Sequence, residues 1–521
     1  MSLSSHTGLT IAGQTLRALR RYPERIAFSS EVGTLTYAGA SDLIGRIQSV
    51  FSRDGLKRGE RMALLSDNSA ESWCAAVAAQ GLGLSTTWLH PKGSLADHSF
   101  QVEDSESAAI IVSPATHAER GRDLASTCGS AVKLFSLGPF DSAPDLLQLA
   151  ADSGATTAVD LAEPDDIALI HYTGGTTGRS KGAVRSNRNA VAFACVSVLA
   201  DIEMPEVPQY LAIAPNSHAG GTMLLPTWRR GGTVHTVSKF EPDRVFNAIE
   251  KGRINITFLV PTMLYALLDH LELSRNDIES LQCIYYGAAP ASPQRLQQMI
   301  DRLGPILSQG YGQTECYPIS VLRRQDHLVP ELLTSCGLPV ANCEVRLLDH
   351  TGQEVPVGEP GEICARTPAA MDFYWRRPEL SAETLQNGWV HTGDIARMDE
   401  RGYMFIVDRM KDLIISGGFN VYPREVEDAL TSCPGVRMAA VVGLPDKYWG
   451  EAVAAAVVVD PEADVSKELL IAHVKLLKGA IHAPKFVQIV TELPLTSLGK
   501  IDKVKLRRRL MDSAAPPFAR A

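Results

Sequence analysis

The sequence predicts an α/β fold: a large N-terminal domain of helix-covered mixed sheets with a small β-barrel-like part, and a small α+β C-terminal domain. From residue 34 to residue 308, short apolar segments alternate with helical stretches, which is typical of sheets covered by helices on both faces. Between about residues 334 and 406, strand-like segments are separated by Gly and Pro turns, and the mixed pattern resumes after Asp408. At 521 residues the chain also exceeds what one hydrophobic core usually supports.

The expected elements of the N-terminal part are short apolar strands and longer stretches of helical character. In chain order they are a strand at 34–37 and a helix ending near Gly55; strands at 61–65 and 110–112 with a helix at 69–82 between them; a strand at 210–213 leading into a helical stretch; strands at 233–237 and 256–260 before helices at 242–251 and 261–271; and strands at 284–286 and 306–308.

The remaining segments predict a small antiparallel barrel or sheet and a separate domain of about 110 residues, a usual domain size. The barrel-like part contains the strand-like pieces 343–347 and 362–365. The C-terminal part contains a helix at 423–431, strands at 438–442 and 451–459, a helix at 467–477, a strand at 486–490 and a basic last helix.

Composition indicates an ordinary globular protein, with 45% hydrophobic and 21% charged residues. The net charge of −9 argues against a nucleic-acid partner, which favours a basic domain. One basic run stands out, made of Lys503, Lys505, Arg507, Arg508 and Arg509. We interpret it as the solvated face of a C-terminal helix, with contact to a membrane surface or a cofactor phosphate as the alternative.

Cysteine usage and the absence of long apolar stretches favour a cytoplasmic protein. The nine cysteines include no C-x-x-C pair, so they fit neither a disulfide framework nor a zinc site and are expected to be reduced thiols. The N-terminal segment lacks the apolar core of a signal peptide. No apolar stretch approaches the roughly 18 residues needed to span a bilayer.

A glycine-rich segment after a short apolar run carries the first chemical signal. Residues 167–182 read IALIHYTGGTTGRSKG, and the apolar run predicts a buried strand. Glycine lets backbone N–H groups approach phosphate oxygens, while Thr, Lys and Arg add hydroxyl donors and positive charge. The spacing is not that of the common nucleotide loop, G-x-x-x-x-G-K-[ST]. The alternative interpretation is a flexible surface loop.

This segment resembles the phosphate loop of the adenylate-forming superfamily, which contains acyl-CoA synthetases, carrier-protein adenylation domains and luciferases, with the approximate pattern YTSGTTGxPKG. Gly175 stands where serine is usual, and Ser180 where proline is usual. Four further motifs follow in the family's order: YGQTE at 311–315, HTGD at 391–394, DRMKD at 408–412 with SGGFN at 416–420, and LGKID at 498–502. The resemblance covers essentially the whole chain and is strongest to fatty or aryl acyl-CoA ligases. It implies a large domain, 1–409, and a small mobile domain, 410–521.

The resemblance implies that a substrate carboxylate attacks the α-phosphate of ATP, giving an acyl-adenylate and pyrophosphate. A carboxylate is already ionised at neutral pH, so this step needs positioning and positive charge rather than a general base. The residues implied at the phosphates are Thr173, Gly174, Gly175, Thr176, Thr177, Gly178 and Lys181. Glu315 is implied as the ligand of Mg²⁺, which prefers one or two carboxylates plus substrate oxygens.

The nucleoside half has its own implied residues. Tyr311 and Gly312 are expected at the adenine, with the chain at Gly287, Ala288 and Ala289 on its other side, where small residues let backbone lie against a flat ring. Asp394 and Arg409 are expected to hold the ribose hydroxyls. Taken singly, each of these two charged residues is more often a surface ion-pair partner.

The resemblance places Lys500, His218 and Thr314 among the catalytic residues. Lys500 is implied to bridge the attacking carboxylate and the α-phosphate, offsetting the charge that builds in the transition state. His218 is expected beside the carboxylate, with a buried core histidine as the alternative. No aspartate occurs between residues 210 and 240, which disfavours an amino-acid substrate. The small residues 219–221 leave room for a fairly large apolar acyl or aryl group.

The second half-reaction implied by the resemblance brings the CoA thiol to the adenylate after the C-terminal domain rotates. Gly417 and Gly418 are expected to form a narrow tunnel for the pantetheine arm, and Lys411 occupies the hinge position. One alternative is an acyl-AMP ligase that loads an acyl carrier protein. A catalytically silent binding module is the alternative from another class, and the sequence opposes it because every implied chemical position is filled.

Overall fold

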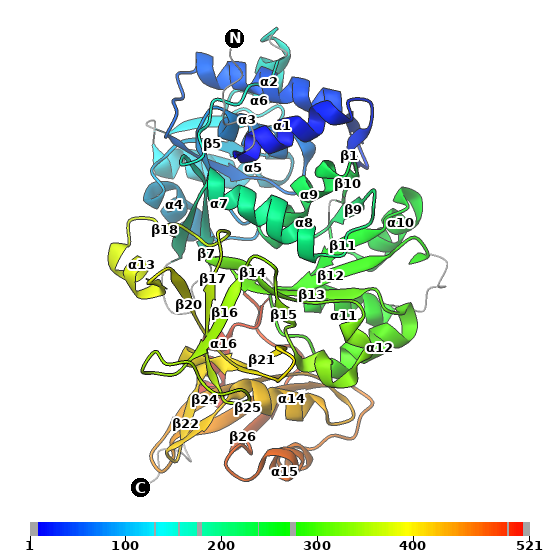
Figure 1. Ribbon diagram of the computed structural model, residues 1–521, viewed down its shortest axis with the longest axis vertical. Coiled ribbons are helices and arrows are strands. Elements are labelled where there is room, and N and C mark those ends of the chain that lie inside the picture. Colours follow the sequence, from blue (N-terminus) through cyan, green and yellow to red (C-terminus); the bar gives the residue numbers. More distant parts are fainter. Residues whose placement is uncertain are drawn as a thin grey trace.

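The computed structural model describes residues 9–129, 132–154, 157–173, 180–237, 239–270, 278–496 and 500–513. Four sheets organise these residues. Figure 1 shows the chain running from the N-terminal helices and sheets at one end of the long axis to the C-terminal sheet at the other. The predicted α/β class with a small C-terminal part is therefore confirmed.

A nine-stranded sheet runs through the middle of the large part. Its order is β15 (Leu338–Pro339), β14 (Cys316–Leu322), β13 (Leu307–Gln313), β12 (Cys283–Gly287), β11 (Ile256–Leu259), β9 (Gln209–Ala212), β10 (Thr233–Thr236), β1 (Ile26–Ser30) and β2 (Gly33–Thr36). The strands from β13 to β1 are parallel, and antiparallel strands stand at both edges. The sheet is mixed, with a parallel centre buried under helices.

A seven-stranded sheet lies beside it and carries the glycine-rich segment. Its order is β18 (Phe373–Tyr374), β8 (Lys181–Ser186), β7 (Ile167–Thr173), β4 (Ser85–Trp88), β3 (Arg61–Leu65), β5 (Ser107–Val112) and β6 (Lys133–Ser136). Strands β7 and β8 form an antiparallel hairpin, whereas the rest from β7 to β6 are parallel. The carboxyl ends of parallel strands meet at one edge, where ligand sites of α/β sheets usually lie.

Helices and short helical turns cover these two sheets. They are α1 (Ile11–Arg21), α2 (Tyr37–Arg53), α3 (Ala70–Gly81), α4 (Leu95–Asp104), α5 (Pro114–Cys128), α6 (Leu146–Ala151), α7 (Asn187–Val191), η1 (Ala192–Ser197), α8 (Val198–Asp201), η2 (Ala219–Met223), α9 (Leu224–Arg229), α10 (Pro242–Gly252), α11 (Pro261–His270), α12 (Pro293–Leu303), η4 (Asp326–Leu328) and η5 (Pro330–Thr334). The largest buried cluster joins α1 to α3 with both sheets and includes Tyr37, Tyr210 and Trp228.

The third and fourth sheets complete the molecule. The antiparallel third sheet contains β16 (Glu344–Leu348), β17 (Gly361–Arg366), β20 (Trp389–Met398), β19 (Leu385–Gln386) and β21 (Met404–Arg409), with α13 (Pro378–Thr384) beside it. After η6 (Met410–Asp412), the fourth sheet contains β23 (Phe419–Val421), β22 (Ile414–Ser416), β25 (Gly450–Val459), β24 (Val436–Asp446) and β26 (Phe486–Ile489). Helices α14 (Pro423–Thr431), α15 (Lys467–Lys478) and α16 (Lys503–Ser513) pack on this sheet.

Two expectations need correction, and some elements were missed. The strand predicted at 34–37 ends at Thr36, whose hydroxyl caps α2 by accepting from Gly39 N, and Tyr37 begins the helix. Strand β7 alternates between buried and half-buried residues instead of being buried throughout. Helices α1 and α4 and strand β4 were not predicted. In the part of the chain that the structure describes, no helix is long and apolar enough to cross a membrane.

The basic run lies on α16, where Lys505, Arg507, Arg508 and Arg509 are exposed, as expected for a solvated helix face. Lys503 differs from its neighbours because its ammonium lies 2.9 Å from a carboxylate oxygen of Glu427. All nine cysteines fall within the described ranges as free thiols, and seven of them are buried.

Candidate active site

The β7–β8 hairpin holds the two ends of the predicted phosphate loop together. Thr173, the last residue of β7, is paired with Lys181, the first residue of β8. Five predicted loop residues lie outside the described residues: Gly174, Gly175, Thr176, Thr177 and Gly178. The described ends of the loop therefore bring one threonine and one lysine to the same edge of the sheet.

The predicted metal ligand, Glu315, lies in the tight turn between β13 and β14. Gln313 pairs with Cys316 across this hairpin, so Thr314 and Glu315 are the two turn residues. The hydroxyl of Tyr374 donates a hydrogen bond to Glu315 Oε1, and the ammonium nitrogen of Lys181 lies 5.1 Å from the centre of the Tyr374 ring. The tyrosine thus links the turn to the phosphate-loop lysine.

Three side chains converge on the buried carboxylate of Asp394, which together with Arg409 was predicted at the ribose. Asp394 Oδ2 accepts hydrogen bonds from the Tyr311 hydroxyl and from Gln313 Nε2, both at 2.7 Å. The guanidinium of Arg409 lies 3.0 Å from Asp394 Oδ1. Asp394 is only 3% exposed, whereas the Arg409 side chain is 44% exposed. Each carboxylate oxygen is bound by a donor, and the arginine faces outward.

Close backbone packing explains the small residues predicted beside the adenine. Gly287 pairs with Gly310 on the neighbouring strand, and a Cβ at Gly287 would lie 2.4 Å from the Gly310 carbonyl oxygen. A Cβ at Gly312 would lie 2.7 Å from the carbonyl oxygen of Cys316. Ala288 has a φ of +68° and is exposed, and Ala289 is half-buried. The backbone that follows β12 is therefore covered by small side chains only.

His218 lies in a cluster of three histidines from three separate segments. Its ring centre is 4.9 Å from that of His90, after β4, and 6.3 Å from that of His171, on β7. His171 Nε2 donates to the Ser217 carbonyl oxygen at 3.1 Å, and the Ser217 hydroxyl lies 2.9 Å from His218 Nδ1. Burial lowers the pKa of His90 and of His171 to about 4, and lowers the pKa of His218 well below its usual value. All three rings are therefore neutral at pH 7.

Lys500 comes from the loop before α16 and lies close to this cluster. Its backbone N–H donates to the Thr496 hydroxyl at 3.2 Å, and its carbonyl accepts from Thr496 N at 2.7 Å. The positive charge of Lys500 adds to the lowering of the His218 pKa, after burial and the neighbouring histidines. A loop of the C-terminal part thus brings a positive charge within electrostatic range of His218.

Gly417 and Gly418 lie elsewhere, in the turn between β22 and β23. Gly417 N donates to the Trp449 carbonyl at 2.7 Å, and a Cβ at Gly417 would lie 2.8 Å from the Trp449 ring. Gly417 has a φ of +60° and Gly418 a φ of +82°, and a Cβ at Gly418 would meet nothing within 4 Å. The turn therefore needs glycine at Gly417 for space and at both positions for conformation.

Sequence reasoning missed several residues of these groups. Two of them could have been found from the sequence. His90 follows β4 at the carboxyl edge of the sheet, where ligand sites usually lie, and His171 is a polar residue within an otherwise apolar strand. Tyr374 carried no such signal, because its contact with Glu315 joins segments 59 residues apart. One further cluster, Glu362, Cys364 and His391, brings its ligand-type atoms within 4.8 Å of one another. His391 Nδ1 lies 2.8 Å from Glu362 Oε2 in it.

The sequence matches two known protein families. The family described as AMP-binding enzyme matches residues 16–375. The chain belongs to the AMP-binding enzyme family. The AMP-binding enzyme C-terminal domain matches residues 425–500, so both parts of this AMP-binding enzyme have counterparts in the family.

Named relatives cover nearly the whole length of this AMP-binding enzyme. A medium/long-chain-fatty-acid–CoA ligase of Mycobacterium tuberculosis is 39% identical, over 98% of this chain and 91% of the relative. A feruloyl-CoA synthase of an Amycolatopsis species is 35% identical, over 95% and 98%. The solved amide bond synthetase McbA from Marinactinospora thermotolerans is 34% identical with a TM-score of 0.89, over 96% and 99%.

Proposed function

We propose that the chain is an ATP-dependent acyl-CoA synthetase. A carboxylic acid and ATP give an acyl-adenylate and pyrophosphate, and CoA then displaces AMP to form the acyl thioester. Its relatives are named CoA ligases for fatty and aromatic acids, which are AMP-forming acid–thiol ligases. An acyl carrier protein in place of CoA is the alternative acceptor.

The observation that carries this proposal is the order of groups along the β13–β14 hairpin. Tyr311 contacts the buried carboxylate of Asp394, and four residues later Glu315 contacts Tyr374, beside Lys181. A bound nucleotide presents its ribose and its phosphates in the same sequence. The hairpin therefore supports a site in which one strand follows ATP from the sugar to the phosphate end.

At the phosphates we assign Thr173, Lys181 and the glycine-rich residues between them. Backbone N–H groups, hydroxyls and one ammonium suit a polyphosphate, and Lys181 is kept near its place by the Tyr374 ring. Glu315 is the residue that would hold Mg²⁺, since a single carboxylate beside substrate oxygens is the donor set this ion accepts. Bound there, the ion would neutralise charge on the phosphates.

For the nucleoside we assign Tyr311, Gly312 and the chain at Gly287, Ala288 and Ala289 to the adenine, and Asp394 with Arg409 to the ribose. Packing against neighbouring backbone already requires glycine at Gly287 and Gly312, so the exposed Ala288 and the half-buried Ala289 support this assignment. Asp394 has both oxygens oriented by donors, which prepares it to accept from a ribose hydroxyl.

Lys500, His218 and Thr314 are assigned to the reacting groups. The Lys500 ammonium lies close enough to act on His218 electrostatically, and it would offset the charge that builds between the carboxylate and the α-phosphate. His218 is neutral and would orient the acid carboxylate by hydrogen bonding rather than by charge. Thr314, beside Glu315 in the turn, would contact the same groups.

We assign the thiol path to Gly417 and Gly418, and the domain boundary to the bond between Arg409 and Met410. Strand β21 ends at Arg409 in the third sheet, and η6 leads from there into the fourth sheet. Lys411 lies within η6. A change of sheet at this point is compatible with rotation of residues 410–521 as one unit.

The acid is proposed to be a fatty or aryl carboxylic acid, and the reaction is proposed to take place in the cytoplasm, where nine free thiols stay reduced. The deciding experiment is a screen of carboxylic acids for pyrophosphate release, with and without CoA. Acid-dependent release of pyrophosphate with formation of an acyl-CoA is the expected result. Release that yields product with a carrier-protein thiol but not with CoA favours the alternative. Absence of release with every acid class contradicts the proposal.

An amine is a second acceptor to include, because one of the solved structures similar to this chain is that of an amide bond synthetase. An amine and a thiol attack the same adenylate carbonyl, so the first half-reaction does not distinguish them. Product analysis with CoA and with a primary amine in parallel measures the preference directly.

A further inference from the structure

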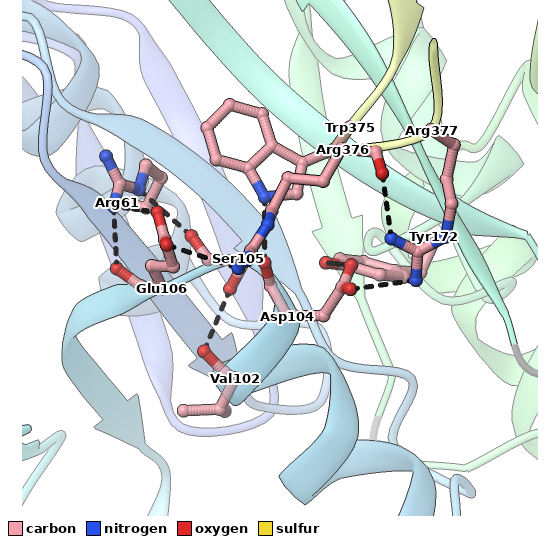
Figure 2. A network of polar contacts seen from close by, with 9 residues as sticks. All are labelled: Arg61, Val102, Asp104, Ser105, Glu106, Tyr172, Trp375, Arg376 and Arg377. Atoms are coloured by element: carbon pink, nitrogen blue, oxygen red, sulfur yellow. Dashed lines mark hydrogen bonds and ion pairs between the residues drawn. The ribbon is translucent and has the colours of Figure 1, made fainter. Parts of the chain in front are cut away.

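A network of polar contacts lies beside the phosphate-loop hairpin, on the side of α4 (Figure 2). Its centre is Asp104, the last residue of α4, whose side chain is 10% exposed. Asp104 Oδ2 accepts from the Tyr172 hydroxyl at 2.8 Å, and Oδ1 accepts from Arg377 Nη2 at 3.1 Å. Its backbone carbonyl accepts from Trp375 Nε1 at 2.7 Å. One residue thus binds three side chains from two distant segments.

These partners lie on or directly after the two strands that flank β8. Tyr172 is on β7, and Trp375 and Arg377 follow β18, while β8 runs between β7 and β18 and begins with Lys181. The backbone N–H of Trp375 also donates to the Gly182 carbonyl at 2.7 Å. Asp104 therefore joins both neighbours of the strand that carries the phosphate-loop lysine.

The neighbours of these partners are the proposed ATP-binding residues themselves. Tyr172 directly precedes Thr173, and because side chains alternate along β7 the two point to opposite faces. Trp375 directly follows Tyr374, whose hydroxyl binds Glu315 and whose ring lies beside Lys181. Asp104 thus binds the sequence neighbours of two residues assigned to the site, Thr173 and Tyr374, and does not itself belong to the site.

Packing at Gly182 makes this support rigid. A Cβ there would lie 2.6 Å from Ile170, 3.2 Å from the Tyr172 ring and 3.4 Å from Trp375. The strand is therefore enclosed by the same two aromatic residues that Asp104 binds. In such a close-packed arrangement a small shift of Tyr172 or Trp375 is transmitted to β8.

We propose that Asp104 is a positioning residue for the ATP phosphates, which clamps β7 to the segment after β18 and so fixes Lys181, Thr173 and Tyr374 relative to one another. This inference rests on the proposed function, because it assigns the clamp to the same phosphate site. It adds a residue that lies outside every motif on which the resemblance depends.

Glu106 provides a matched control within the same network. It lies two residues further on, is 51% exposed, and pairs with Arg61 at 3.0 Å and with Arg376 at 3.2 Å. Like Asp104 it is a carboxylate bound to an arginine of the segment after β18. Among the described residues, the hydrogen bonds and ion pairs of Glu106 reach neither β7 nor Trp375; it is linked to Trp375 only indirectly, through Arg61, whose guanidinium lies 5.5 Å from the centre of the Trp375 ring. Glu106 therefore does not close the clamp.

The test compares Asp104→Asn, Tyr172→Phe, the double variant and Glu106→Gln with the wild-type chain. Asp104→Asn keeps the size and loses the charge that holds Arg377, and Tyr172→Phe loses only the hydroxyl. For Asp104→Asn we expect the KM for magnesium-ATP to rise about tenfold, equivalent to about 1.4 kcal/mol. The KM for the acid and thioester formation from synthetic acyl-adenylate, which needs no pyrophosphate group, should stay within about twofold of wild type.

Tyr172→Phe should change the KM for magnesium-ATP in the same direction. In the double variant the two effects should sum to less than their separate values, because both changes weaken the same clamp at Asp104. Glu106→Gln should behave as wild type. The inference is overturned if Asp104→Asn leaves the KM for magnesium-ATP unchanged, or if it slows both half-reactions equally while lowering the melting temperature, as a merely structural residue would. Tyr172→Phe decides the matter if Asp104→Asn does not fold.

Equilibrium binding of a non-hydrolysable magnesium-ATP analogue separates this inference from the proposed function. If the wild-type chain releases no pyrophosphate with any acid, the proposed function fails, and the affinities of wild type and Asp104→Asn for the analogue still decide the role of Asp104. Equal affinities contradict the clamp. Weaker binding by Asp104→Asn with normal binding by Glu106→Gln supports it.

Discussion

At the scale of single residues, the charged groups of the site are paired before any substrate is bound. Glu315 accepts from Tyr374, and Asp394 accepts from Tyr311 and Gln313 and pairs with Arg409. Burial raises the pKa of the Tyr374 hydroxyl, and the charge of Glu315 raises it further. The hydroxyl therefore remains a donor at neutral pH and orients Glu315 Oε1.

Glu315→Gln keeps the side-chain volume and removes the negative charge. At limiting Mg²⁺ we expect acid-dependent pyrophosphate release to fall about a hundredfold, comparable to loss of one preorganised electrostatic partner. Raising the Mg²⁺ concentration should restore part of it. The measurement is initial pyrophosphate release across a magnesium titration. Tyr374→Phe is the control, since it keeps the carboxylate, and unchanged turnover of Glu315→Gln at limiting Mg²⁺ would exclude a metal role.

His218→Asn tests the acid side of the site. We expect the KM for the acid to rise about tenfold, equivalent to about 1.4 kcal/mol of binding, with the KM for magnesium-ATP unchanged. His235→Asn serves as control, because His235 is also half-buried, with a pKa lowered to about 4 by burial, but it lies on β10 and bonds Gln209. An equal rise in both KM values for His218→Asn would contradict a role at the acid.

The pH profile gives a second measurement for the histidine cluster. Since burial lowers the pKa of His90 and His171 to about 4, the profile of kcat/KM for the acid should show no inflection near the ordinary histidine pKa of about 6.5. An inflection there that disappears in His218→Asn would show that the ring titrates in the working range.

At the scale of elements, the junction between β21 and α14 contains a buried carboxylate. Asp408 Oδ1 accepts from Arg409 N at 2.7 Å, and Oδ2 accepts from Arg424 N, in the first turn of α14, at 2.9 Å. Burial raises its pKa to about 6, although Lys503 and these hydrogen bonds act in the opposite direction. The carboxylate thus ties the third sheet to the first helix of the C-terminal part.

The sign of the resulting pH dependence follows from the raised pKa. The folded chain binds a proton at Asp408 more tightly than the unfolded chain, whose carboxyl titrates near 3.8. The stability contribution, about 3 kcal/mol in all, is complete below the unfolded pKa and is lost as the pH rises through about 6.

Asp408→Asn removes this titration. The stability of wild type relative to the variant should therefore increase by about 1.4 kcal/mol between pH 8 and pH 5. Thermal unfolding of both proteins at the two pH values measures the change. A difference between wild type and variant that is independent of pH, or that grows toward pH 8, would contradict the raised pKa of Asp408.

At the scale of the whole molecule, two regions of the C-terminal sheet serve two half-reactions in the proposed mechanism. The loop with Lys500 reaches the histidine cluster, whereas the Gly417 and Gly418 turn packs on Trp449. Contacts between the parts include a hydrogen bond from Arg424 to the Ala291 carbonyl at 3.2 Å and an ion pair between Arg437 and Asp269 at 2.9 Å. Such a polar interface is compatible with rotation of one part against the other.

Lys500→Ala and Gly418→Asn should separate the half-reactions. Lys500→Ala is expected to lose acid-dependent pyrophosphate release by about two to three orders of magnitude, as for a deleted oxyanion donor, and to keep thioester formation from synthetic acyl-adenylate and CoA. Gly418→Asn should do the reverse. Asparagine is chosen because it tolerates the left-handed φ of +82° at Gly418 better than other side chains, and a Cβ there has open space.

Assays of each half-reaction on both variants check this pairing, because one small domain presents one face at a time. If both variants remain folded and lose both half-reactions equally, the rotation does not apply to this chain. The C-terminal part would then act as a static lid.

Much of the fold was predictable where one segment carries its own pattern. Strand β3 and helix α14 were predicted with their observed bounds. Errors occur where contacts with other segments determine the secondary structure. Tyr37 has a strand-like sequence context, but burial in the main core and the Thr36 cap place it in α2. Helix α1 was missed although its sequence carried two signals, the Thr10 cap and apolar residues at helical spacing on one face, which packs against α3 and α9.

The sequence by itself determined the class of fold, the family resemblance and the chemical types at the site, because glycines, charged residues and their spacing are local properties of the chain. Only the tertiary structure decided which of these groups meet. Tyr374 binding Glu315, His90 and His171 surrounding His218, and Asp104 joining Tyr172 to Arg377 all unite segments distant in the chain. Such contacts depend on how strands are ordered in a sheet and on which side chains share a face, and neither is encoded in any single segment.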